Sequence, residues 1–183
     1  VMHTIEAVIE SGLEKVAVAA VFDPEAVIQM QEAGVGAEIE LSLGGRYDMP
    51  SISLKGKPLT LKGKVKVLAD GHWTVHGPMY TGVEVFMGPT AVFEVGNVEI
   101  VVVSLHHEPW DTGVFTSVGI QPLQKKYLVL KSRIHYRAGF APIAKHTLHC
   151  DGEGVTTSRN ELLEYKNIRH PIYPLDPETK FEQ

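Results

Sequence analysis

The segment KSRIHYRAGFAPIA, residues 131–144, decides how the carboxyl-terminal half of the fold is built. It follows YLVL, residues 127–130, a short apolar run typical of a buried strand. Ser132 is a good helix N-cap, and the apolar residues after it recur at helical spacing. Pro142 has no backbone N–H to donate, so the helix should end or kink just before it. The segment therefore predicts a strand whose carboxyl end runs directly into the amino end of a helix.

Four polar side chains crowd into this junction: Lys131, Ser132, His135 and Arg137. A helix amino end offers free backbone N–H groups, and ligands of open α/β sheets bind where strands end and helices begin. Ser132, His135 and Gly139 share one helical stripe, and Gly139 leaves room for an approaching group. The junction is therefore a candidate site for an anion or carboxylate. The alternative is a capped helix with two solvated bases and a histidine bonded to a backbone carbonyl.

The composition is that of an ordinary globular protein. The chain has 183 residues, 44% hydrophobic and 21% charged, which is enough for one domain with a full core. A net charge of −5 without a basic block argues against a nucleic-acid surface. A lone cysteine, Cys150, excludes an internal disulfide framework and favours a reducing cytoplasm. No apolar run approaches the roughly 20 residues of a membrane span, so no membrane partner is expected.

A second strand–helix unit is expected near the amino end. Residues 15–22, KVAVAAVF, form a continuous apolar run, as in a strand covered on both faces. Asp23 then suits a helix cap and Pro24 the first helical position, while Gly34 suits a left-handed residue after the helix end. Before this unit, the apolar residues of 3–12 recur at helical spacing.

The central third has the pattern of an antiparallel β-meander. Strands separated by short glycine-containing turns are expected at residues 59–68, 72–75, 81–87, 90–95 and 98–104. A separate strand is expected before them at residues 38–43, joined to the meander by a long polar loop over 46–57. A short helix over 111–118 and a strand over 146–150 should follow. Three prolines predict an extended tail over 170–183. The expected class is α/β, a mixed sheet with strand–helix units at both ends of the chain, with α+β as the alternative. Residues 1–183 should form a single domain.

Two glycine-containing turns are further candidates. Gly44 and Gly45, with Arg46 and Asp48 beside them, are placed to cradle an anion through backbone amides, although such a pair is also a plain turn. The string GPMYTG around Tyr80 predicts either a rigid turn that presents this side chain or a buried tyrosine that packs a corner.

A metal site is the remaining chemical hypothesis. His106, His107, Glu108 and Asp111 are the best group of potential ligands in a chain with nine histidines. Adjacent side chains on an extended chain point apart, so one ion would require a tight bend at Pro109. The alternative is a polar loop after a strand. The residues by themselves give no complete catalytic set.

Seven strings, in this order, resemble the carboxyl-terminal region of the MlrC family of microcystin-degrading proteins and its proposed metallopeptidase relatives. They are VFDPEAV (21–27), AGVGA (33–37), LGGRYD (43–48), GPMYTG (77–82), MGPTAVFEVGNVEIVVVS (87–104), VLKSRIHYRAGFAPIA (129–144) and HPIYPLD (170–176). The resemblance implies a hydrolase of peptide or related amide bonds. It also implies that a larger amino-terminal domain holds zinc. This chain would be the partner of that domain and would be inactive alone. No residue here corresponds to the zinc ligands, so no metal position is assigned to this chain.

The family usually carries an Asp-Asn-Pro and glycine-rich segment before the first helix, so a fragment of a longer protein is expected. A short native protein with a trimmed amino end is the alternative. The resemblance further implies that Lys131, His135 and Arg137 lie near the interdomain cleft, where they bind a substrate carboxylate or orient the metal-bound water. Relatives often have an arginine-rich string where this chain has His106 and His107, so its specificity should differ if those arginines touch substrate.

Two other functions remain open at this point. The first is a non-catalytic structural or dimerisation domain, which would give a homo-oligomer. The second is a free-standing module that binds a small anion at the Lys131–Arg137 junction.

Overall fold

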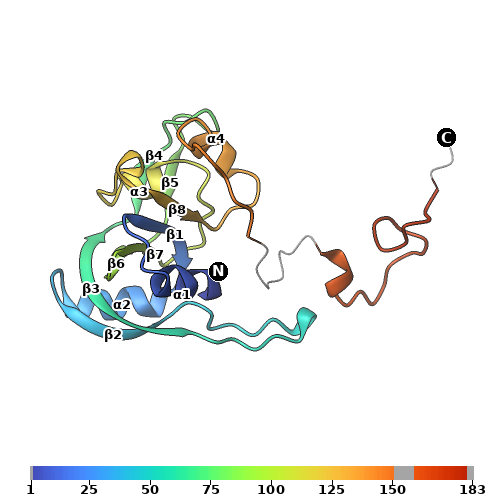
Figure 1. Cartoon of the computed structure of the whole chain (residues 1–183), viewed down its shortest axis with the longest axis horizontal. Coiled ribbons are helices and arrows are strands. Elements are labelled where there is room, and N and C mark those ends of the chain that lie inside the picture. The colour runs from blue at the N-terminus through green and yellow to red at the C-terminus, as the bar shows by residue number, and fades with distance from the viewer. Residues whose placement is uncertain (1, 151–158, 181–183) are drawn as a thin grey trace.

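The helices and strands were located in a computed structural model, which describes residues 2–150 and 159–180 (Figure 1). The α-helices are α1 (Met2–Glu10), α2 (Pro24–Ala33), α3 (Gly113–Thr116) and α4 (Tyr136–Phe140). The strands are β1 (Val16–Phe22), β2 (Glu38–Leu43), β3 (Leu59–Ala69), β4 (His72–Thr74), β5 (Glu84–Phe86), β6 (Thr90–Val95), β7 (Val98–Val103) and β8 (Tyr127–Leu130). Short 3-10 helices span Pro50–Ile52, Pro122–Gln124 and Asn160–Leu162.

Six of these strands form one mixed sheet in the order β2-β3-β6-β7-β1-β8. The pairs β2–β3, β3–β6 and β6–β7 are antiparallel, whereas β1 pairs parallel with both β7 and β8. The α/β class with a mixed sheet is therefore confirmed. Because β7, β1 and β8 run in the same direction, their carboxyl ends lie at one edge of the sheet. This edge is called the carboxyl edge below.

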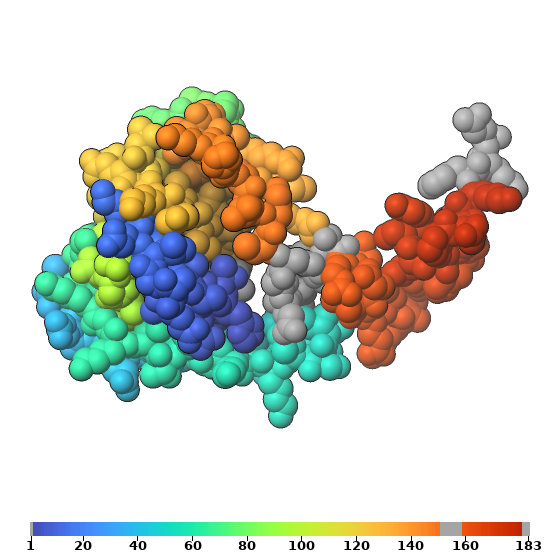
Figure 2. All heavy atoms as spheres, viewed as in Figure 1, coloured from blue at the N-terminus to red at the C-terminus, as the bar shows by residue number. Residues whose placement is uncertain are grey.

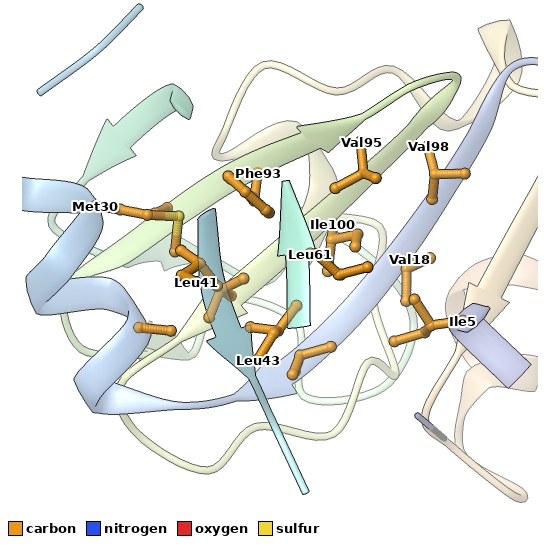
Figure 3. Packing of buried hydrophobic residues seen from close by; sticks show 14 of the residues in the cluster. Ile5, Val18, Met30, Leu41, Leu43, Leu61, Phe93, Val95, Val98 and Ile100 are labelled. Atoms are coloured by element: carbon orange, nitrogen blue, oxygen red, sulfur yellow. The ribbon is translucent and has the colours of Figure 1, made fainter. Parts of the chain in front are cut away.

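The long strand β3 bends the sheet. Its first half pairs with β2, and its second half, from Lys64 onward, pairs with β6. The sheet therefore curls, and the end of β2 returns to β1, where the backbone N–H of Gly44 donates to Asp23. Figure 3 shows the side chains enclosed by this curl, among them Leu41 and Leu61.

The two faces of the sheet pack against separate hydrophobic clusters. Alternate side chains of β7 divide between them: Val98, Ile100 and Val102 join the cluster under α1 and α2, while Val101 and Val103 join the cluster of α3, α4 and the β4–β5 ribbon. Both sets are buried, which explains why β1 is apolar without alternation and why β7 is apolar except for Glu99. The expected coverage of β1 on both faces is confirmed.

The predicted helix after Asp23 is also confirmed. Asp23 Oδ1 accepts a hydrogen bond from the backbone N–H of Ala26 at 2.9 Å, and Pro24 occupies the first turn. Gly34 has the expected positive φ of 83°, but its ψ of 161° lies outside the left-handed helical region. The first helix, α1, ends two residues earlier than residue 12 and buries Ile5 against the sheet.

The expectation of one continuous meander was wrong. Among the strands that the structure describes, β4 and β5 pair only with each other, and β3 lies directly beside β6. The reason is burial, because Trp73 and Val85 of this ribbon pack against the face of the sheet rather than extend it.

Three further predictions were wrong in the carboxyl-terminal part. The helix expected from Ser132 starts only at Tyr136, although the Ser132 hydroxyl oxygen accepts a hydrogen bond from the backbone N–H of Tyr136. Residues 146–150 do not form a strand, and their only large apolar side chain, Leu148, is 89% exposed. Within the described residues, the tail curls rather than extends, because Asp176 accepts hydrogen bonds from the Ile172 backbone and the His170 ring, both at 2.8 Å. Residues 181–183 of the expected tail lie outside the described part.

No helix among the described residues has the length and apolar character needed to cross a membrane.

Candidate functional site

Three segments that sequence analysis singled out meet at the carboxyl edge. β1 leads into Asp23, β7 leads into the segment 104–111, and β8 leads into Lys131. Neighbouring parallel strands place the residues that follow them side by side. The predicted junction therefore lies where ligands of α/β sheets usually bind.

Asp23 is the centre of the first cluster at this edge. Its carboxylate is buried and accepts hydrogen bonds from the backbone N–H of Gly44 at 2.7 Å and from Arg46 Nε at 2.9 Å. Arg46 also donates to the Ser42 carbonyl at 2.6 Å and pairs with Glu25 at 3.2 Å. The predicted glycine cradle thus binds an anion, but the anion is a carboxylate of the chain itself.

The glycine pair is required by close backbone packing. Gly44 and Gly45 have positive φ angles of 56° and 61°. A Cβ on Gly45 would lie 2.5 Å from the carbonyl oxygen of Lys57. Asp48, the other candidate in this loop, accepts from the backbone N–H of Gly56 at 2.8 Å and so fixes the loop rather than an external ligand.

Glu108 is the centre of the second cluster. Its Oε1 accepts from the Ser132 hydroxyl at 2.6 Å, and its Oε2 lies 2.9 Å from His135 Nδ1. Partial burial raises the pKa of Glu108, but the hydrogen bonds from Ser132 and His135 outweigh it and hold the pKa below its ordinary value. Ser132 and His135 therefore converge on a carboxylate of the chain itself, whereas the predicted ligand was an external anion or carboxylate.

The two basic residues of the junction do not join this contact. Lys131 is exposed, and its backbone N–H donates to the Ala19 carbonyl at 2.8 Å. Arg137 is also exposed, and its guanidinium lies 5.9 Å from the centre of the Tyr136 ring. Both cationic side chains are open to solvent beside the Glu108 cluster.

Asp111 links the Tyr80 turn to the same region. Its carboxylate is buried and accepts from the backbone N–H groups of Gly77 at 2.7 Å and Gly113 at 2.8 Å. The turn presents Tyr80, which is 60% exposed and contacts Trp110 edge-on. The alternative of a buried tyrosine was therefore wrong.

The two adjacent histidines point apart, as expected for an extended chain. The ring of His106 stacks on Phe22 with 3.7 Å between centroids, whereas His107 packs between Trp73 and Trp110. Burial lowers the pKa of His107 to about 4, although the negative charges of Glu108 and Asp111 act to raise this pKa. The two rings therefore do not face a common position where they could bind one metal ion.

The described residues do not fit a metal centre. No group of three or more histidine, cysteine, aspartate or glutamate side chains among residues 2–150 and 159–180 is placed to hold an ion. The oxygens of Asp23 and Asp111 are already bound by N–H groups, and those of Glu108 by Ser132 and His135.

Sequence reasoning placed Glu108 only in a metal hypothesis and missed its role as a hydrogen-bond acceptor, whereas Asp111 was also expected to cap a short helix and accepts from the backbone N–H of Gly113. The signal was present in the order of the elements. Glu108 follows β7 and Ser132 follows β8, and strands that both run parallel to β1 end at the same edge.

The comparison with known proteins agrees with the resemblance of the seven strings. A family model described as MlrC C-terminus matches residues 1–167. The chain belongs to this MlrC C-terminal family. Microcystinase C of Sphingomonas sp. is 23% identical over 176 residues, which are 96% of this chain and 32% of that protein. A crystal structure of a "Putative metallopeptidase" from Mesorhizobium sp. BNC1 is 26% identical, with a TM-score of 0.80 over 98% of this chain and 35% of that one. The chain spans about a third of the length of these relatives.

Proposed function

We propose that this chain is the carboxyl-terminal domain of an MlrC-like metallohydrolase that acts on peptide or related amide bonds. The observation that carries the proposal is the family match over residues 1–167. The relatives described as a microcystinase and as a metallopeptidase support the same reaction class. In this proposal the carboxyl edge forms one wall of the substrate cleft, and a preceding amino-terminal domain forms the other.

The metal belongs to that other domain. The described residues offer no cluster of ligands for an ion, so we assign the zinc of the family to the amino-terminal domain. This chain alone should therefore have no hydrolytic activity. Its contribution is to bind and orient the substrate.

Lys131 and Arg137 are the proposed substrate-binding residues. Both are exposed at the carboxyl edge, and neither side chain is held by an ion pair with a described residue. Charge-assisted hydrogen bonds to a carboxylate are about twice as strong as neutral ones. A peptide with a free carboxylate is therefore the expected ligand of this wall.

The test is a comparison of peptide hydrolysis by the full-length protein loaded with zinc. The double variant Lys131→Ala/Arg137→Ala should raise KM about tenfold or more for a peptide that bears a carboxylate. The same peptide with its carboxylate amidated should show no such loss. Lys62→Ala, an exposed lysine on β3, is the matched control. An unchanged KM in the double variant would remove these residues from substrate binding.

A second candidate function is a structural or dimerisation role. The segment 159–180 extends away from the body of the molecule (Figures 1 and 2) and exposes apolar side chains. These include Leu162, Tyr165 and Tyr173. Analytical ultracentrifugation of the intact chain and of a variant that ends at residue 158 tests this role. A dimer that becomes a monomer on truncation would support it, and a monomer in both cases would refute it.

The free-standing anion-binding module loses its main support. Two of the polar groups of the Lys131–Arg137 junction, Ser132 and His135, bind Glu108 of the same chain.

A further inference from the structure

Glu108 determines which nitrogen of His135 carries a proton. The two oxygens of Glu108 serve two donors separately, Ser132 through Oε1 and His135 through Oε2. An ionised carboxylate only accepts hydrogen bonds, so His135 Nδ1 must carry the hydrogen in this contact. In the neutral ring, the lone pair therefore lies on Nε2.

The contact is held by packed backbone rather than by flexible side chains alone. The backbone N–H of Tyr136 donates to the Ser132 hydroxyl oxygen at 3.0 Å, which leaves the Ser132 hydrogen directed at Glu108. Tyr136 itself is buried. Gly139 of the same helix packs against the backbone that follows Glu108, where an added Cβ would lie 2.7 Å from the Trp110 carbonyl oxygen. The helix and the Glu108 segment are therefore closely packed against each other.

The second nitrogen of His135 is free to act on a ligand. The His135 side chain is 51% exposed, and Nε2 has no hydrogen-bond partner in the described part of the chain. The exposed cations Lys131 and Arg137 flank the ring in sequence. A histidine whose Nδ1 is held by a carboxylate while Nε2 faces a substrate is the arrangement of a general acid–base catalyst.

We propose that Glu108 is a positioning residue that presents His135 Nε2 as the proton acceptor and donor of this wall of the cleft. The inference rests on the proposed function and adds a reaction step to it. His135 Nε2 takes a proton from the attacking water as the oxygen–carbon bond forms. It then gives this proton to the leaving nitrogen as the carbon–nitrogen bond breaks. The water hydroxyl ends on the carbonyl carbon, its proton ends on the amine, and His135 returns to its neutral form.

The first experiment measures the His135 tautomer by ¹⁵N NMR of the intact chain at a pH where the ring is neutral. The wild type should carry hydrogen on Nδ1. Glu108→Ala should shift the ring toward the Nε2–H form, which imidazole side chains favour in water. Glu32→Ala, an exposed glutamate on α2, is the control and should leave the tautomer as in the wild type. A wild-type ring protonated on Nε2 would overturn the proposal without touching the proposed function.

The second experiment measures hydrolysis by the zinc-loaded full-length protein. His135→Ala should lower kcat about 100-fold. Glu108→Gln, which keeps the shape of the side chain, should lower kcat about tenfold with little change in KM, and Glu108→Asp should restore part of the loss. An active wild type whose kcat is unaffected by these changes refutes the role of the dyad but leaves the proposed function standing. An inactive wild type refutes the proposed function, and the catalytic use of the dyad with it.

Discussion

Arg46 Nε lies 2.9 Å from both carboxylate oxygens of Asp23, although 23 residues separate the two in sequence. The carboxylate also accepts the backbone N–H groups of Ala26 and Gly44. Its side chain is fully buried. This one group therefore joins the end of β1, the start of α2 and the end of β2.

Replacing Asp23 by alanine should lower the free energy of unfolding by about 3 kcal/mol, because three donors lose a buried partner. Urea denaturation measures this loss. Glu25→Ala is the matched control, since Glu25 pairs with the same arginine at a solvent-exposed position and should cost less than about 1 kcal/mol. Equal losses in the two variants would show that Asp23 is no more than another surface ion pair.

His107 should make stability depend on pH below neutrality. Its pKa is lowered by burial from 6.5 to about 4, so between these values the unfolded chain binds a proton that the folded chain does not. Stability is therefore complete above pH 6.5 and falls as the pH drops toward 4, by at most about 3 kcal/mol. Screening by solvent makes the loss of stability smaller than this upper value.

His107→Phe should flatten this part of the pH dependence, because phenylalanine fills the space between Trp73 and Trp110 without titrating. Denaturant unfolding at a series of pH values measures the slope. Leu105→Ala, two residues earlier and exposed, should keep the wild-type slope. An unaltered slope in His107→Phe would assign the pH dependence to other groups.

Gly139→Ala should lower the free energy of unfolding by about 2 kcal/mol, because the new methyl group meets backbone atoms that cannot move aside easily. The closest are the Trp110 carbonyl oxygen at 2.7 Å and the Asp111 Cα at 2.8 Å. Thermal or urea unfolding measures the loss. Ala141→Ser, at the exposed end of α4, should change stability by no more than about 0.5 kcal/mol. A variant as stable as the wild type would mean that α4 shifts freely on the Trp110 segment.

Glu99→Gln should lower the free energy of unfolding by about 2 kcal/mol, because Glu99 is buried on β7 and pairs with both Lys66 and Lys125. Burial raises the pKa of Glu99, but the hydrogen bonds from the two lysines outweigh it and lower the pKa. This stabilisation is therefore present above about pH 4.5, the ordinary value of the group, and is lost as the pH falls.

Urea unfolding at pH 7 and at pH 4 measures the contribution of Glu99, and the difference between wild type and variant should shrink at the lower pH. Glu94→Gln is the control, because Glu94 is more exposed and, among residues 2–150 and 159–180, forms an ion pair only with Lys66. It should cost less than about 1 kcal/mol. A gap between wild type and Glu99→Gln that does not change with pH would contradict the charged role of Glu99.

The sequence by itself determined the elements whose signals are local. Asp23 and Pro24 fixed the start of α2, and the apolar run before them fixed β1. Alternation predicted β2, and the glycine turn at Gly96 predicted the β6–β7 hairpin. Each of these signals depends on residues within a few positions of one another, so a pattern along the chain is sufficient to read it.

The tertiary structure decided where two elements depart from their local pattern. Trp73 is buried in the cluster on one face of the sheet, and β4 pairs with β5 rather than with β3. Ser132 accepts the backbone N–H of Tyr136 and also donates to Glu108, yet the helix begins only at Tyr136. Both elements contact a distant segment that the local pattern does not predict.

The tertiary structure alone also decided which polar groups remain free at the candidate site. Asp23 accepts a hydrogen bond from the backbone N–H of Gly44, which is 21 residues away in the sequence. Glu108 likewise binds the ring of His135, 27 residues away, and Asp111 accepts from the backbone N–H of Gly77, 34 residues away. The sequence singled out Gly44, Ser132 and His135, but the acceptors of their hydrogen bonds are set by the tertiary structure, in which β7 and β8 both lie beside β1 and the end of β2 reaches Asp23. Such pairings follow from which strands lie side by side, and no spacing along the chain encodes that arrangement.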